Sequence, residues 1–111
     1  MRLRNAVLAA ASALALALAV PASATAAGGE FRYKYRNFLG EQLGALFDPA
    51  GRACVNLPEA GRNEPAYAPN NRTNSTATVF PEFDCEGDTY YVLRPGGRAG
   101  DRLLVRSVVF S

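Results

Sequence analysis

The sequence has no histidine, and it has only two cysteines among its 111 residues. The lack of histidine excludes catalytic triads and dyads built on an imidazole, and it removes the commonest zinc ligand. Two cysteines are also too few thiolates for a structural zinc site. We therefore expect a protein that is not an enzyme.

Long apolar runs are scarce as well, because only one is present and it covers residues 6–20. Arg2 and Arg4 precede this Ala- and Leu-rich run, and small residues follow it after Pro21. A positive start, an apolar centre and small residues at the end are typical of a secretory signal peptide. A retained membrane anchor is the alternative, but a spanning helix needs about 20 apolar residues, and this run is shorter.

The cleavage signal fits two positions. The A-x-A pattern ends at Ala24 and again at Ala26, and both sites stay open. We predict a signal peptide over residues 1–26 and a single secreted, extracellular, β-rich domain over 27–111. No later apolar run is long enough to span a membrane, so we expect this domain to be free of the membrane after cleavage, and monomeric.

An excess of charge is also missing. The formal net charge of +2 includes Arg2 and Arg4, so the domain that follows the predicted signal peptide is near neutral. Nucleic-acid-binding domains carry a clear basic excess. We therefore expect no nucleic-acid partner.

The two cysteines, Cys54 and Cys85, are an even pair in a chain predicted to be exported. In an oxidising compartment such a pair is read as a disulfide. The bridge would close a loop of about 30 residues and stabilise the fold by about 3–4 kcal/mol. A metal site is the alternative, but the chain offers it no further thiol and no histidine.

Short runs rich in β-branched and aromatic residues alternate with turn residues, which predicts an all-β sandwich or barrel. The candidate strands lie at 31–36, 53–57, 76–80, 89–93 and 103–110. One weak helix is predicted over 38–47, where leucines have helix-like spacing but Gly40 and Gly44 interrupt it.

The stretch 58–74 is rich in proline and asparagine, and it predicts a long loop inside the disulfide-closed segment. Loops of this length are usually functional or mobile. We take residues 58–70 as a candidate binding loop that includes Pro65, Tyr67 and Pro69, with Tyr67 as an exposed aromatic anchor.

Two segments share the pattern of an aromatic residue, four residues, a second aromatic position, any residue and glycine. Its three positions are Tyr33, Phe38 and Gly40 in the first copy, and Phe80, Cys85 and Gly87 in the second. The pattern resembles the Greek-key signature of βγ-crystallin domains, and the ending 94–110 resembles the close of such a motif. The resemblance implies a small Greek-key β-sandwich, similar to small secreted bacterial metalloproteinase inhibitors and killer-toxin-like proteins.

Calcium is the one cofactor that this resemblance implies. Crystallin-like domains commonly bind it through a run of the form N/D-N/D-x-x-S/T-S, which the chain matches at Asn70, Asn71 and Ser75 and departs from at Asn74. Asparagine oxygens can ligate this hard cation. The alternative is a polar turn capped by its own side chains.

Three functions are compatible with these features. The first is a secreted binding module that inhibits a peptidase, with a secreted protease as its partner. The second is a calcium-stabilised structural extracellular protein. The third is a cell-envelope or carbohydrate-binding domain, suggested by tyrosines expected to be exposed. These are Tyr33, Tyr35, Tyr67, Tyr90 and Tyr91.

Overall fold

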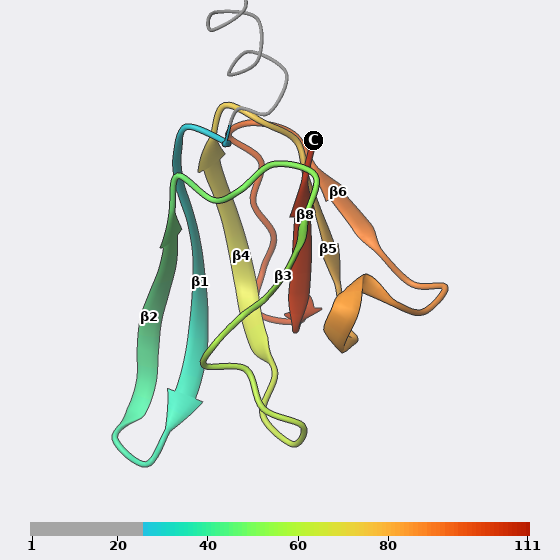
Figure 1. Cartoon of the computed structure of the whole chain (residues 1–111). Coiled ribbons are helices and arrows are strands. Elements are labelled where there is room, and N and C mark those ends of the chain that lie inside the picture. Colours follow the sequence, from blue (N-terminus) through green and yellow to red (C-terminus); the bar gives the residue numbers. More distant parts are fainter. Residues whose placement is uncertain (1–25) are drawn as a thin grey trace, which may run out of the picture.

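A computed structural model describes residues 26–111 (Figure 1). The predicted signal peptide, apart from Ala26, lies outside the described residues. The described chain forms eight strands and one 3-10 turn. They are β1 (Gly29–Asn37), β2 (Gly40–Phe47), β3 (Cys54–Asn56), β4 (Ala66–Thr73), β5 (Ala77–Phe80), η1 (Phe83–Cys85), β6 (Tyr91–Leu93), β7 (Leu104–Val105) and β8 (Ser107–Phe110).

The strands make two antiparallel four-stranded sheets, in the orders β2-β1-β4-β7 and β3-β8-β5-β6. The apolar inner faces of the two sheets pack against each other, and the predicted all-β sandwich is confirmed. Within residues 26–111 no helix is long and apolar enough to cross a membrane.

The two halves of the domain repeat one arrangement. In the first half, β1, β2 and β4 lie in one sheet while β3 lies at the edge of the other. In the second half, β5, β6 and β8 share a sheet while β7 lies at the edge of the first. Each half therefore donates its third strand to its neighbour's sheet, and neither half is complete without the other.

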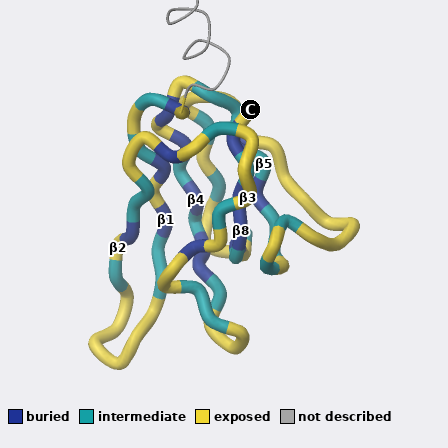
Figure 2. The backbone as a smooth tube through the Cα atoms, in the orientation of Figure 1, coloured by how far each residue is buried: buried dark blue, intermediate teal, exposed yellow. Residues whose placement is uncertain are grey.

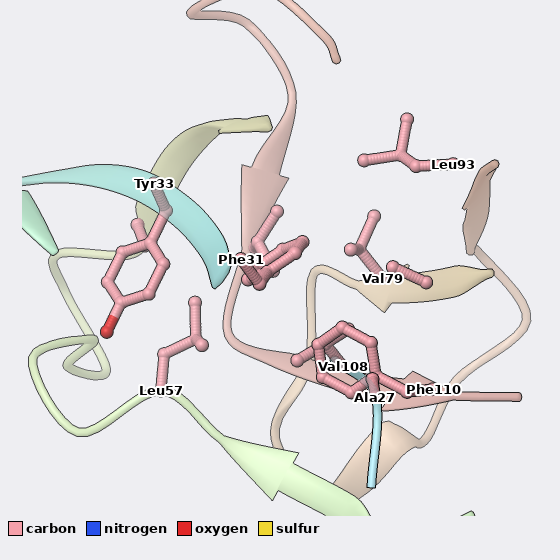
Figure 3. Packing of buried hydrophobic residues seen from close by; sticks show 11 residues of the cluster. Ala27, Phe31, Tyr33, Leu57, Val79, Leu93, Val108 and Phe110 are labelled. Atoms are coloured by element: carbon pink, nitrogen blue, oxygen red, sulfur yellow. The ribbon is translucent and has the colours of Figure 1, made fainter. Parts of the chain in front are cut away.

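The core lies between the sheets (Figure 3). Its centre is Phe31 on β1, whose ring meets that of Phe110 on β8 edge-on at a centroid distance of 5.5 Å. Val79, Val108 and Leu57 are almost fully buried around this pair. The alternation predicted for 31–36 is confirmed, because Phe31 and Tyr33 are buried while Arg32 between them is exposed.

The predicted helix over 38–47 is wrong, because Gly40–Phe47 is strand β2, paired with β1 along its full length. Phe38 and Leu39 form the two-residue connection, and Gly40 follows it with a φ of 102°. Gly44 lies against the ring of Tyr33, where an added Cβ would stand 2.3 Å from Cε2. Gly40 and Gly44, the two glycines that disfavour a helix, are therefore both needed by the β1–β2 hairpin.

The predicted long loop over 58–74 is also wrong beyond residue 65, because Ala66–Thr73 is strand β4, between β1 and β7. Pro69 cannot donate to a ladder of hydrogen bonds, and a bulge resolves the conflict. The register with β1 shifts between Arg32 and Lys34, and Ala68 takes a left-handed φ of 51°. The bulge lets a proline lie inside an interior strand.

The predicted strand over 103–110 is divided in two. Leu104–Val105 is β7 in the first sheet, and Ser107–Phe110 is β8 in the second. Arg106 is the residue at which the chain changes sheets. An apolar pattern cannot show this change, because both parts bury side chains.

The predicted disulfide between Cys54 and Cys85 is confirmed, with a Cα–Cα distance of 5.9 Å. It joins β3, which belongs to the first half, to η1 in the second half. The N–H of Cys85 also donates to Oγ of the buried Ser107 at 2.9 Å. The bridge thus fastens the exchanged strand β3 to the half whose sheet it extends.

Candidate functional site: a braced surface loop

The predicted aromatic anchor, Tyr67, is only 5% exposed, so its assignment as an exposed anchor is wrong. Its hydroxyl donates to Oε1 of Glu41 at 2.7 Å, and the guanidinium of Arg36 lies 5.4 Å from its ring centroid. Burial, and then the hydrogen bond to Glu41, raise the pKa of Tyr67. Pro69 is also fully buried, and Pro65 alone of the three predicted residues stays in a loop.

The loop that does reach the surface covers residues 58–65, between β3 and β4. Pro58, Glu59, Arg62, Asn63 and Glu64 are exposed. The loop lies at the same end of the domain as the β1–β2 turn, which is the lower end in Figures 1 and 2. It is the part of the predicted binding loop that a partner can touch.

The side chain of Arg106 holds this loop through hydrogen bonds to its backbone. Its Nε donates to the carbonyl oxygen of Gly61 at 3.1 Å, and its Nη2 donates to that of Arg62 at 2.7 Å. Its Nη1 donates to the carbonyl oxygen of Pro81 at 2.7 Å. A guanidinium offers several N–H donors in a rigid plane, so one side chain ties the loop to the segment before η1.

Two short backbone contacts shape the loop further. The N–H of Gly61 donates to the carbonyl oxygen of Glu64 at 2.8 Å, which closes a tight turn around Arg62 and Asn63. The N–H of Ala60 donates to the carbonyl oxygen of Leu57 at 3.1 Å, and Leu57 is buried in the core. The loop is therefore ordered at its base and at its tip.

A third tie comes from the core. The hydroxyl of Tyr33 donates to Oε1 of Glu59, and Figure 3 shows this hydroxyl pointing out of the apolar cluster. Burial of Tyr33, and then its hydrogen bond to Glu59, raise the pKa of the phenol above its ordinary value. Tyr33 therefore stays neutral and remains a hydrogen-bond donor at every physiological pH.

Two hollows lie beside the loop. One has a volume of about 280 Å³, and the other about 550 Å³. The first is lined by Arg36, Asn63, Glu64, Pro65, Tyr67, Asp101 and Leu104. The second is lined by Arg62, Glu82, Phe83, Asp84, Glu86, Gly87 and Arg106. The exposed tip of the loop thus stands between two mixed-charge depressions that side chains of a partner could enter.

The predicted calcium residues do not meet as one set. Asn70 lines an outer hollow with Lys34 and Arg98, whereas Asn71, the next residue along β4, is fully buried on the opposite side. Oδ1 of Asn71 accepts from the N–H and hydroxyl of Thr73, and its Nδ2 donates to the carbonyl oxygen of Ser75 at 2.8 Å. Nδ2 of Asn71 also donates to the carbonyl oxygens of Leu93 and Arg94. Within residues 26–111 no three acidic, cysteine or histidine side chains gather into a metal cluster.

The five tyrosines expected at the surface differ widely in burial. Tyr33 and Tyr67 are buried, so the prediction of exposure is wrong for both. Tyr35 is half-buried, while Tyr90 and Tyr91 are exposed beside and on β6. The five rings therefore make no continuous aromatic face.

Arg106 and Glu59 are the site residues that sequence reasoning missed. A signal for Arg106 existed, because it is a charged residue inside an otherwise apolar run. Such a residue needs polar partners if the run is buried. Its partners, the carbonyl oxygens of Gly61, Arg62 and Pro81, belong to the backbone, so no pattern of side chains could have named them.

No family model, curated protein or solved structure matches this chain.

Proposed function

We propose that this protein is a secreted binding module that presents the loop 58–65 to an extracellular peptidase and inhibits it. The observation that carries the proposal is the bracing of the loop by Arg106, which donates to two consecutive loop carbonyls. The exposed residues around Asn63 form the contact surface.

The physical argument concerns the entropy of binding. A flexible loop loses conformational freedom when a partner orders it, and each immobilised side chain costs about 0.5–1.5 kcal/mol. A loop already held by the scaffold loses much less. A peptidase that binds such a loop also cannot easily draw its backbone into the extended form needed for cleavage, so binding becomes inhibition.

The predicted signal peptide and the Cys54–Cys85 disulfide support secretion. Disulfides persist in oxidising compartments and are rare where thiols are kept reduced. An extracellular peptidase would therefore share the compartment of this protein.

The repeat of the two halves supports membership in the βγ-crystallin-like group. Gly40 and Gly87, the final residues of the two predicted motif copies, both have a positive φ, of 102° and 92°. The first copy departs from the expected packing, because Phe38 is 94% exposed at the hairpin tip. The proposal therefore rests more on the second copy and on the strand order.

A panel of secreted metallopeptidases and serine peptidases, assayed with the exported, oxidised protein, tests this function. We expect tight, reversible inhibition of at least one enzyme. The variant Arg106→Gln should weaken that inhibition by about tenfold or more and should let the enzyme cut within 58–65. The matched control is Arg102→Gln, which removes the same charge from an exposed position and should inhibit like the wild type.

The proposal fails if no peptidase is inhibited and the wild-type loop is cut as fast as that of Arg106→Gln. It also fails if the two arginine variants inhibit equally well. Arg106→Lys is a second variant, which keeps the charge but lacks the planar set of donors. It keeps the test valid if Arg106→Gln merely unfolds.

A further inference from the structure

Strand β2 differs from the other edge strands of the sandwich. In the part of the chain that the structure describes, the two sheets end in β2, β7, β3 and β6. The last three contain only two or three residues each, whereas β2 contains eight. Short edges are one of the ways in which proteins prevent strands of different molecules from pairing, and β2 is not protected in this way.

Other protective features are also missing from β2. Its sequence, GEQLGALF, has no proline and no lysine, and Glu41 is its one charged residue. Its register with β1 runs without a bulge from Phe47 to Gly40. An edge strand leaves about half of its N–H and C=O groups without a partner strand. Strand β2 therefore offers a long, regular edge for another strand.

The side chains of this edge are apolar and exposed. Leu43 and Phe47 are 78% and 73% exposed, and they alternate along β2 on the outer face of the sheet. Leu39, in the hairpin turn, is 71% exposed and adjoins Phe38 at the tip. Figure 2 shows this turn as an exposed tip that projects from the sheet. Isolated exposed leucines are common, but this group is contiguous with an open strand edge.

We propose that β2 pairs antiparallel with β2 of a second copy of this chain, with Gly44 on the two-fold axis. In this register Leu43 lies opposite Ala45 of the second copy, and Glu41 lies opposite its Phe47. The two Glu41 residues are then six positions apart along the paired strands, or about 20 Å, so no like charges face each other. The pairing joins two four-stranded sheets into one of eight strands, and it replaces the expectation of a monomer.

The symmetry of this edge favours a second copy. Leu39, Leu43, Phe47 and Phe38 each expose on the order of 150 Å², or roughly 600 Å² together, and edge-to-edge pairing covers the flanks of Leu43 and Phe47 together with the open backbone groups of β2. This contact is smaller than a standard interface, which buries about 800 Å² from each partner, and so fits a reversible dimer. A two-fold contact also needs a surface that is complementary to itself. Strand β2 meets this condition, because its one charged residue lies near one end and a glycine lies on the axis.

Sedimentation velocity over a range of concentrations tests the inference with the exported, oxidised chain. We expect a monomer–dimer equilibrium in which the dimer grows with concentration. Leu43→Glu should raise the dimer Kd by about tenfold or more. The fold should survive, because residue 43 faces Lys34 on β1, so the new carboxylate has a cationic neighbour within its own molecule.

The matched control is Val92→Glu, which places the same charge at a 59% exposed position on the edge strand β6. It should leave the dimer Kd unchanged. Amide hydrogen exchange gives a second readout, since the amides of Leu43 and Ala45 should become more protected as concentration rises. A chain that stays monomeric up to about 1 mM overturns the inference and leaves the edge to an extended segment of another protein. A dimer that both variants weaken equally, or that leaves the β2 amides unprotected, overturns it as well.

Discussion

Nη2 of Arg106 donates a hydrogen bond to the carbonyl oxygen of Arg62 at 2.7 Å, across 44 positions of sequence. The contact joins the residue at which the chain changes sheets to the surface loop 58–65. The geometry of the loop is therefore coupled to the packing of β7 and β8. The proposed contact surface is therefore coupled to the sandwich that carries it.

Removal of this contact should loosen the loop more than the fold. Arg106→Gln cannot reach the carbonyl oxygens of Gly61, Arg62 and Pro81 together, so we expect a loss of about 2 kcal/mol in the free energy of unfolding. The amide of Gly61 should exchange with solvent at least about tenfold faster than in the wild type. Urea unfolding and hydrogen exchange measure the two effects. Equal exchange rates at Gly61 would show that Arg106 does not order the loop.

The tie between Tyr33 and Glu59 predicts a response to alkaline pH. Burial and the hydrogen bond to Glu59 raise the pKa of Tyr33 in the folded state, whereas a tyrosine in the unfolded chain ionises near pH 10. Above that pH the unfolded chain loses a proton that the folded state keeps, so stability should fall as pH rises. Below it Tyr33 adds no pH dependence.

Tyr33→Phe should remove this contribution. The variant loses the hydrogen bond to Glu59, at a cost of about 1 kcal/mol at neutral pH. It should then lose less stability than the wild type between pH 9 and 11, since one tyrosine with a raised pKa is gone. Tyr67, whose pKa is also raised, keeps part of the slope in both proteins. Parallel pH dependence in wild type and variant would contradict the assignment.

Gly44 should tolerate no side chain. An added Cβ would stand 2.3 Å from Cε2 of Tyr33, which is held in the core, so we expect Gly44→Ala to destabilise the fold by about 2–3 kcal/mol. Gly100→Ala is the control, because no atom lies within 4 Å of a Cβ at that position. Urea unfolding measures the loss of unfolding free energy in both variants. Equal losses would refute the packing argument.

The disulfide should contribute a large share of the stability of this small domain. Cys54 and Cys85 close a loop with a sequence separation of 31 residues, for which loop entropy gives about 3–4 kcal/mol. The double variant Cys54→Ala/Cys85→Ala should therefore unfold at a markedly lower urea concentration. Reductant should lower the urea midpoint of the wild type by a similar amount and leave the midpoint of the double variant unchanged. A loss below about 1 kcal/mol would mean that β3 docks without its bridge.

Asn71 should act as a structural residue. Its side chain bonds three backbone carbonyls and Thr73 in a buried position, so Asn71→Ala should cost about 2–4 kcal/mol by leaving those groups unpaired. Because Oδ1 already accepts two hydrogen bonds, we expect millimolar calcium to leave the melting temperature of the wild type unmoved. A rise in melting temperature with calcium, lost in Ser75→Ala and Asn70→Ala, would instead support the calcium-stabilised alternative.

Much of the fold could be predicted from local patterns. The alternation around Phe31 and Tyr33 identified β1, and short runs of strand-forming residues bounded by turn residues identified β3, β5 and β6. The predictions failed where one residue met a distant partner. Leu43 and Leu46, which have helical spacing, lie in β2 because β1 offers a complete set of backbone partners. Pro69 lies in β4 because a bulge at Ala68 interrupts the hydrogen-bond ladder where the proline has no N–H to donate.

The sequence by itself determined the all-β fold class and the pairing of Cys54 with Cys85, because periodicity and cysteine parity act through near neighbours and composition. Only the tertiary structure decided that Arg106 divides a strand and holds a loop, that Tyr67 is covered rather than exposed, and that β2 is left with a long open edge. Those features depend on which strands lie side by side, and strand order arises from contacts between residues far apart in the chain.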